Sequence, residues 1–208
     1  MILIKPSFEI MSKTFSDNAL NLIEKAGRTC YKSEDKITSE SAKKFVRDIL
    51  KRGHESVIEH SSMTVKFICD RGVSHEIVRH RLCAFSQEST RYVNYKGGCT
   101  FVIPPWMSDY KTYGEHNYPH EYWIWMQAME RSESDYQSLL DIGWSPQQAR
   151  SVLPNSTKTE IVVTANFREW RHIFNLRCQK AAHPQMREIM IPLLKECQKT
   201  IPIIFDLN

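Results

Sequence analysis

Hydrophobic residues recur at every second position along several short segments of the chain. The alternation is clearest over residues 62–69, where Met63, Val65, Phe67 and Cys69 share one side. This pattern is typical of a strand with one buried face, since successive side chains on a strand point to opposite sides. Strands are predicted over residues 2–11, 62–69, 91–95, 100–103 and 159–165.

Apolar residues spaced three or four positions apart predict helices between these strands. The predicted helices cover residues 17–29, 40–52, 75–82, 120–140, 168–176 and 184–199, with a shorter helix starting at Pro146. Thr38 or Ser39 is expected to cap the second helix, and Gly53 to end it. Ser74 is expected to cap the third helix, which would carry residues 79–81.

The order of strands and helices favours an α+β fold. No repeat, low-complexity segment or linker interrupts the chain, so residues 1–208 are expected to form a single domain. With 41% of its residues apolar, a chain of this length can bury a sizeable core. The sequence therefore predicts a mainly antiparallel sheet flanked by helices.

Composition excludes several classes of protein. No Gly-rich phosphate-binding motif is present, which argues against Rossmann and P-loop nucleotide sites. The opening residues lack the layout of a signal peptide, and no apolar run approaches the length of a membrane span. The six cysteines are scattered without a C-x-x-C pair, as in a reduced, cytoplasmic protein. The net charge of +4 suits anionic small molecules better than a nucleic-acid-coating surface.

The densest candidate chemistry is the run Arg79-His80-Arg81, followed by Ser89 and Arg91. Neighbouring side chains on a helix diverge by about 100°, so these three would not serve one contact. An arginine offers a fork for phosphate or for a uracil-like edge, and His80 a switchable donor. If the chain is extended from residue 89, Ser89 and Arg91 would share a side and bind phosphate. A solvated charged run, or Ser89 as a nucleophile without an identifiable base, are the alternatives.

Other polar clusters are open to two interpretations. Residues 54–60 contain two histidines and two glutamates, but their spacing is not that of a zinc motif, so a polar, ligand-binding turn is favoured over a metal site. Glu76 would either pair with Arg79 or orient it toward a nucleotide. Asn166 is a natural helix cap, and Arg177 suits a helix C-terminus through the macrodipole.

Together these motifs resemble the flavin-dependent thymidylate synthases. The run at residues 79–81 followed by Ser89 after seven intervening residues is similar to that family's signature. Segments similar to other family motifs lie at residues 54–60, 149–154 and 166–177, so that the four motifs occur in the family's order. The resemblance covers most of the chain and is weakest over about residues 100–145.

The resemblance implies roles for individual residues. Flavin contacts are implied for Ser56, Glu59, Arg79, His80, Arg81, Gln87, Asn166, Arg168, His172 and His183, with His54 a weaker candidate. Contacts to dUMP are implied for Glu76, Arg79, Gln87, Glu88, Ser89, Thr90, Arg91, Arg150 and Arg177, of which Arg177 would be catalytic. The chain departs from the usual family residues at Glu76, Gln87 and His172, where Gln, Glu and Asn are common.

The resemblance also implies a reaction and its participants. It is the reductive methylation of dUMP to dTMP, with methylenetetrahydrofolate as carbon donor and FAD, reduced by NAD(P)H, as hydride source. No cysteine nucleophile, metal, membrane or nucleic acid takes part. The family fold would assemble as a homotetramer with shared active sites, which would let residues 79–81 face different neighbours.

Functions from other classes stay open on the sequence alone. Basic and aromatic side chains at Arg91, Tyr92, Tyr95 and Lys96 are compatible with an RNA-binding surface. A cysteine-dependent methyltransferase is a further alternative. A flavin spectrum, a salt-dependent affinity for RNA and sensitivity to thiol alkylation distinguish the three.

Overall fold

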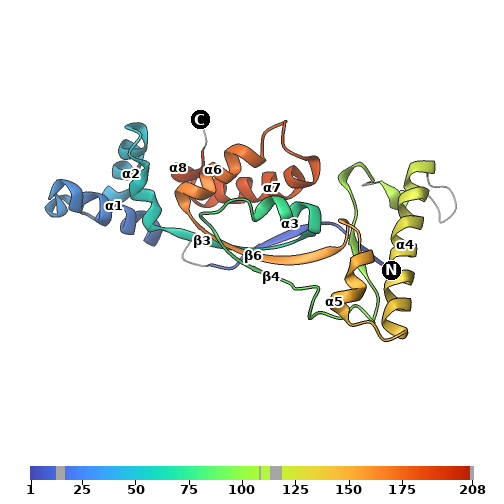
Figure 1. The fold of residues 1–208 in the computed structure, drawn as a ribbon. Helices are drawn as coiled ribbons and strands as arrows, with labels where there is room; N and C mark the ends of the chain where they lie inside the picture. Colours follow the sequence, from blue (N-terminus) through green and yellow to red (C-terminus); the bar gives the residue numbers. More distant parts are fainter. Residues whose placement is uncertain (13–16, 108, 113–118, 207–208) are drawn as a thin grey trace. The chain divides into compact units, whose positions relative to one another are not determined.

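The computed structural model describes residues 1–12, 17–107, 109–112 and 119–206 (Figure 1). Its contacts divide the chain into two compact units, each described by itself. Unit 1 comprises residues 1–7, 67–79 and 86–161; unit 2 comprises residues 8–66, 80–85 and 162–208. The single domain over residues 1–208 stays a prediction.

The sheets confirm the expected α+β class. A sheet with antiparallel pairing has the strand order β2-β3-β6-β4, and β1 pairs with β5 in parallel. The strands are β1 (Ile2–Ile4), β2 (Ser7–Ile10), β3 (Ser62–Asp70), β4 (Ala84–Gln87), β5 (Thr100–Val102) and β6 (Lys158–Asn166). The alternation predicted for β3 is confirmed, because Met63, Val65 and Phe67 are fully buried. Figure 1 shows β3 and β6 as the long neighbouring strands.

Two strand predictions need correction. Residues 2–11 form two strands, β1 and β2, separated by Lys5-Pro6, where proline supplies no N–H for a ladder. Residues 91–95 form no strand. The backbone N–H groups of Tyr92 and Val93 both donate to the Ser89 carbonyl, which closes a turn instead.

Unit 2 contains most of the helices. They are α1 (Asp17–Tyr31), η1 (Glu34–Lys36), α2 (Ser41–Lys51), η2 (Glu55–His60), α6 (Phe167–Arg177), α7 (Pro184–Thr200) and α8 (Pro202–Phe205). α1 packs on α2, and α6 packs on η2, α7 and α8. In its core the Phe205 ring contacts the rings of Phe167 and Phe174, and the Trp170 indole donates to the Met63 carbonyl at 3.0 Å.

The start of α2 differs from the prediction. The residue that caps it is Glu40, whose side chain makes no capping hydrogen bond, rather than Thr38 or Ser39. Thr38 lies before the helix, and its hydroxyl accepts a hydrogen bond from the backbone N–H of Glu40. Gly53 ends the segment as expected, with a φ of 74° that favours glycine.

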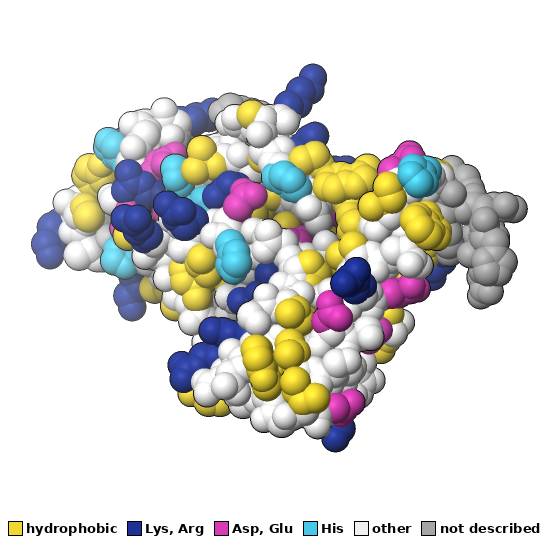
Figure 2. Space-filling model, turned by 45° about the vertical axis from the view of Figure 1, so that its right-hand side comes forward, with side chains coloured by type: hydrophobic (Ala, Val, Ile, Leu, Met, Phe, Trp, Pro, Cys, Tyr) yellow, Lys and Arg dark blue, Asp and Glu magenta, His cyan; other side chains and the backbone are white. Residues whose placement is uncertain are grey.

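Unit 1 packs α4 (His120–Asp141) and α5 (Pro146–Ala149) around a smaller core. Its short helices are α3 (Arg71–Ile77), η3 (Pro105–Met107), η4 (Tyr110–Thr112) and η5 (Arg150–Val152). Its buried cluster consists of Cys99, Phe101, Met129, Tyr136 and Ala149. Large apolar side chains also remain exposed in this unit, and Figure 2 shows exposed apolar side chains on one face of the molecule. Those of unit 1 include Trp106, Trp123, Ile124, Ile142 and Trp144.

The helix predicted to carry residues 79–81 is shorter than expected. α3 ends at Ile77, and residues 79–81 lie in the irregular segment that follows it. The cap is Asp70 rather than Ser74: its buried carboxylate accepts from the Val73 N–H at 2.8 Å. This cap starts the helix at Arg71, directly after β3, and the helix ends at Ile77, before residue 79. Among the described residues, no helix is long and apolar enough to cross a membrane.

Replacing Asp70 tests this cap. Asp70→Ala is expected to lower the free energy of unfolding by about 1–2 kcal/mol, the usual cost of losing a capping acceptor. Asp70→Asn retains an acceptor oxygen and should keep most of the stability. Urea unfolding of both variants measures the difference, and an Asn variant as unstable as the Ala variant would contradict the capping role.

Candidate functional site

A polar cavity of about 700 Å³ lies within unit 2. It is built by η2, the segment after α3, and α6 with its capping residue. The residues that line it are Glu55, Glu59, Leu82, Asn166, Arg168, Glu169, Arg171, His172 and Asn175. Its size is within the range of about 300–1,000 Å³ typical of small-molecule and cofactor sites. The lining supplies both cationic donors and anionic acceptors.

The start of α6 positions the cavity-lining side chains. The side-chain oxygen Oδ1 of Asn166 accepts from the Glu169 backbone N–H at 2.8 Å, which caps the helix as predicted. The Phe167 N–H donates to the Ser61 carbonyl at 2.9 Å, so the helix begins beside β3. Arg168 and His172 are one turn apart on this helix, and both line the cavity.

Carboxylates of η2 hold the arginines of α6. An Arg168 guanidinium N–H donates to Glu59 at 2.6 Å, and the Arg171 guanidinium lies 3.2 Å from Glu55. The bond to Glu59 raises the pKa of Arg168. Arg171 also donates to the Ile204 carbonyl. The arginine and glutamate side chains of the cavity are therefore already paired with each other.

His80 connects this region to Arg177. The Arg177 Nε–H donates to His80 Nε2 at 2.9 Å. His80 is only 7% exposed, and burial, Arg177 and His172 together lower its pKa to about 4. Its other nitrogen, Nδ1, lies 3.8 Å from a carboxylate oxygen of Glu169. His80 is therefore neutral at physiological pH and accepts a hydrogen bond from Arg177.

Unit 1 groups several residues that the resemblance assigns to the nucleotide. The Gln87 amide donates to the hydroxyls of Ser74 at 2.9 Å and Thr159 at 3.2 Å. The Glu88 carboxylate accepts from the Tyr95 hydroxyl at 2.6 Å and from Lys158 at 3.0 Å. Both side chains thus have protein partners.

The residues after Glu88 form a turn rather than an extended segment. The Ser89 hydroxyl accepts from the Arg91 backbone N–H at 3.3 Å, and the Arg91 guanidinium lies over the Tyr92 ring. The expectation that Ser89 and Arg91 share one side of a strand is therefore wrong. Arg150 donates to the Thr90 hydroxyl at 3.1 Å, which joins two residues of the predicted phosphate-binding set.

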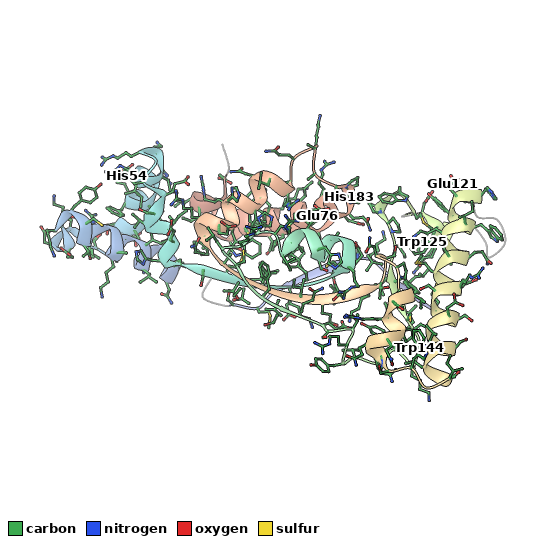
Figure 3. All side chains as sticks on the ribbon, viewed as in Figure 1. His54, Glu76, Glu121, Trp125, Trp144 and His183 are labelled. Atoms are coloured by element: carbon green, nitrogen blue, oxygen red, sulfur yellow. The ribbon has the colours of Figure 1, made fainter. Side chains whose placement is uncertain are left out.

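Other predicted residues lie outside the cavity. Ser56, Arg79 and Arg81 are exposed, and Glu76 is partly buried on α3. His183 caps α7 by accepting from the Gln185 N–H (Figure 3). His54 follows α2 and places Nδ1 at 3.1 Å from the Tyr31 hydroxyl, so the structure shows it as part of a tyrosine contact.

Comparison with known proteins decides the family. The sequence profile of a family described as "Thymidylate synthase complementing protein" matches residues 9–203. The chain belongs to this family of flavin-dependent thymidylate synthases. It is 34% identical to the flavin-dependent thymidylate synthase of Geobacter sulfurreducens over 86% of this chain and 78% of that protein. It is 34% identical to the enzyme of Mycobacterium tuberculosis over 92% of this chain and 80% of that one.

Solved structures agree on the fold. Streptomyces cacaoi PolB, described as a UMP/dUMP methylase bound with 5-Br dUMP, superposes with a TM-score of 0.81 at 24% identity. The match covers 99% of this chain and 96% of that one. The chain thus has the fold of this family and is an enzyme of the flavin-dependent thymidylate synthase class.

The sequence motifs of flavin-dependent thymidylate synthases did not identify the whole cavity. Glu55, Leu82, Glu169, Arg171 and Asn175 line it but were assigned no role. The helical spacing of Arg168, Arg171 and Asn175 was a usable signal. Nothing in the sequence pattern indicated that Glu169 faces His80, because those residues are distant in the chain.

Burial raises the thiol pKa of five cysteines. Burial, with a contribution from Glu169, raises the pKa of Cys83 to about 12, and burial raises that of Cys178 to about 11. Burial likewise raises the pKa of Cys197 to about 12 and of Cys99 to about 11, and raises that of Cys69 further. These five thiols are protonated at neutral pH and are poor nucleophiles.

The lowered pKa of His80 predicts a pH dependence of stability. Between pH 6.5 and about 4 the unfolded chain binds a proton at His80 that the folded chain does not, so stability falls as the pH falls. His80→Gln retains an acceptor for Arg177 without titrating. The free energy of unfolding should fall between pH 7 and pH 4 in both proteins. We expect the fall in His80→Gln to be about 2 kcal/mol smaller than the fall in the wild type. Urea unfolding across this range measures both; equal losses would contradict a buried neutral His80.

Proposed function

We propose that this enzyme methylates dUMP to dTMP with a bound FAD as its redox cofactor. Its relatives are named flavin-dependent thymidylate synthases, and PolB, which shares its fold, is described as a UMP/dUMP methylase. The observation that carries the proposal is the polar cavity of unit 2. Its walls contain Glu59, Asn166, Arg168 and His172, all residues that the family resemblance assigns to flavin.

The chemistry of the cavity fits FAD. A flavin dinucleotide has a pyrophosphate that suits guanidinium donors, and ribose and ring polar atoms that suit carboxylate and amide partners. Arg168 would hold the pyrophosphate, and Glu59, Asn166 and His172 would hold the remaining polar groups. By resemblance, Ser56, Arg79, Arg81, Gln87 and His183 add further contacts. The bound flavin supplies the hydride that completes the new methyl group.

Arg177 is the proposed catalytic residue. Its fixed positive charge, aimed by the bond to His80, stabilises the negative charge that develops on a uracil ring. Because a guanidinium does not lose its proton at physiological pH, this stabilisation is present throughout the reaction.

The remaining nucleotide contacts come from the residues that the resemblance assigns. Ser89, Arg91 and Arg150 would bind the phosphate, and Thr90 orients Arg150 through their hydrogen bond. Gln87 and Glu88 would also contribute to the nucleotide site. Their side chains are held in place by hydrogen bonds to Ser74 and from Lys158, respectively. Glu76 and Arg79 complete the proposed set, with Arg79 contacting flavin as well.

The proposed reaction uses no cysteine nucleophile. The raised thiol pKa of Cys83, the cysteine nearest to the predicted motif, supports this. Methylenetetrahydrofolate would donate the carbon and NADPH would reduce the flavin, in the cytoplasm.

We further propose a homotetramer of single-domain chains with shared active sites. The exposed tryptophans and isoleucines of unit 1 support an interface, since large apolar side chains left exposed can mark sites of association.

The cofactor proposal is tested by visible absorption. Wild-type protein loaded with FAD and freed of excess is expected to retain a flavin spectrum, and Arg168→Ala to retain at least tenfold less flavin. Arg131→Ala is the matched control, because Arg131 is 85% exposed on α4. A colourless wild type that binds RNA with a steep salt dependence would overturn the proposal.

The catalytic proposal is tested at Arg177. Arg177→Ala is expected to lower dTMP formation by about a hundredfold or more, as when a charge-stabilising donor is removed, while flavin stays bound. The assay follows product from dUMP, methylenetetrahydrofolate and NADPH, with UMP as an alternative substrate. Unchanged turnover in the variant would exclude the catalytic role.

A further inference from the structure

A buried carboxylate separates the cavity from His80. Glu169 is 8% exposed and lines the cavity, and one of its oxygens lies 3.8 Å from His80 Nδ1. Its backbone N–H is bonded to the Asn166 cap, which fixes the start of its side chain. No family motif assigned Glu169 a role, although it is placed between the proposed flavin residues and the proposed catalytic arginine.

The protonation of His80 follows from its contact with Arg177. Arg177 Nε carries a hydrogen and can only donate, so His80 Nε2 must be the unprotonated acceptor. In a neutral imidazole the single proton then resides on Nδ1, the nitrogen that faces Glu169. At 3.8 Å the carboxylate is too far for a direct hydrogen bond, but it still attracts the positive end of the Nδ1–H dipole.

We propose that Glu169 is a positioning residue: it holds His80 in the Nδ1–H tautomer and thereby orients the Arg177 guanidinium. The effect on dUMP rests on the proposed function, whereas the tautomer does not. The opposite tautomer places hydrogens on both His80 Nε2 and Arg177 Nε, so the two would repel and Arg177 would turn away.

Burial and the surrounding charges keep His80 neutral while Glu169 selects the tautomer. A carboxylate alone would favour a doubly protonated imidazole, which offers Arg177 no acceptor. Burial is the main factor that opposes that second proton, followed by Arg177 and then His172. Burial, with a smaller contribution from Glu169, raises the pKa of the Cys83 thiol, so this thiol also stays neutral. Within unit 2 these groups leave one proton on the imidazole, on the side of the carboxylate.

The tautomer is measured directly by NMR of protein labelled with ¹⁵N-histidine. In wild-type holoenzyme at pH 7.5 we expect the His80 signal, assigned by its loss in His80→Gln, to show a protonated Nδ1 and an unprotonated Nε2. Glu169→Ala is expected to shift a measurable population to the Nε2–H form, and Glu169→Gln, whose carbonyl still accepts, to shift less. A wild-type Nε2–H form, or an unchanged tautomer in Glu169→Ala, would overturn the proposal.

Kinetics then test whether Glu169 acts through His80. Glu169→Ala is expected to lower kcat/KM for dUMP about ten- to a hundredfold, the scale of a small misplacement of a catalytic group. In a His80→Gln background, which has no tautomer to select, the same substitution should cost less than threefold. Glu55→Gln, in the same cavity but paired with Arg171, is the matched control and should not alter the tautomer.

The outcomes separate the two proposals. An equal loss from Glu169→Ala in both backgrounds, accompanied by lost flavin absorbance, would assign Glu169 to direct flavin binding and refute the positioning role. If wild type makes no dTMP but the NMR result holds, the proposed function fails while the His80 tautomer and the orientation of Arg177 stand.

Discussion

Two hydrogen bonds at the junction of β6 and α6 position most of the cavity in unit 2. Asn166 caps the helix through the Glu169 N–H, and the Phe167 N–H bonds to Ser61 at the edge of β3. Because the helix can start in only one register under these bonds, every later side chain on α6 has a defined direction. Arg168 and His172 therefore face the cavity, and Glu169 faces His80. A shift of one residue at this junction would turn all three away.

The charged side chains that line the cavity include three glutamates and two arginines, so carboxylates outnumber guanidinium groups before any ligand binds. Carboxylates of η2 already bond to the guanidinium groups of Arg168 and Arg171. These pairs restrict the arginine side chains, which lowers the conformational entropy lost when they bind an anion. The same pairs mean that the pyrophosphate of the proposed flavin would compete with Glu59 and Glu55, so its affinity would reflect an exchange of partners. His80 differs from these charged pairs, because it must be uncharged to accept the hydrogen bond from Arg177.

The sequence was a reliable guide where structure depends on neighbours along the chain. The alternation in β3, the helical spacing of α1, α4, α6 and α7 and the cap at Asn166 are all confirmed. It was misleading near residues 70–95. There Asp70 rather than Ser74 caps α3, and the turn at Ser89 replaces a predicted strand. Both errors arose because local hydrogen bonds, to the Asp70 carboxylate in one case and to the Ser89 carbonyl in the other, outweighed a weak apolar period.

Family and fold class were determined by the sequence, and the candidate ligand residues were predicted from it, since motif spacing and side-chain periodicity are local properties of a chain. The pairing of His80 with Arg177 was not, because it joins residues 97 positions apart. The same holds for Glu59 and Arg168, which are 109 positions apart. Contacts between distant segments depend on how strands and helices pack, and packing is set by the whole core. Tertiary structure alone therefore decided that His80 is buried and neutral, and that Glu169 lies beside it.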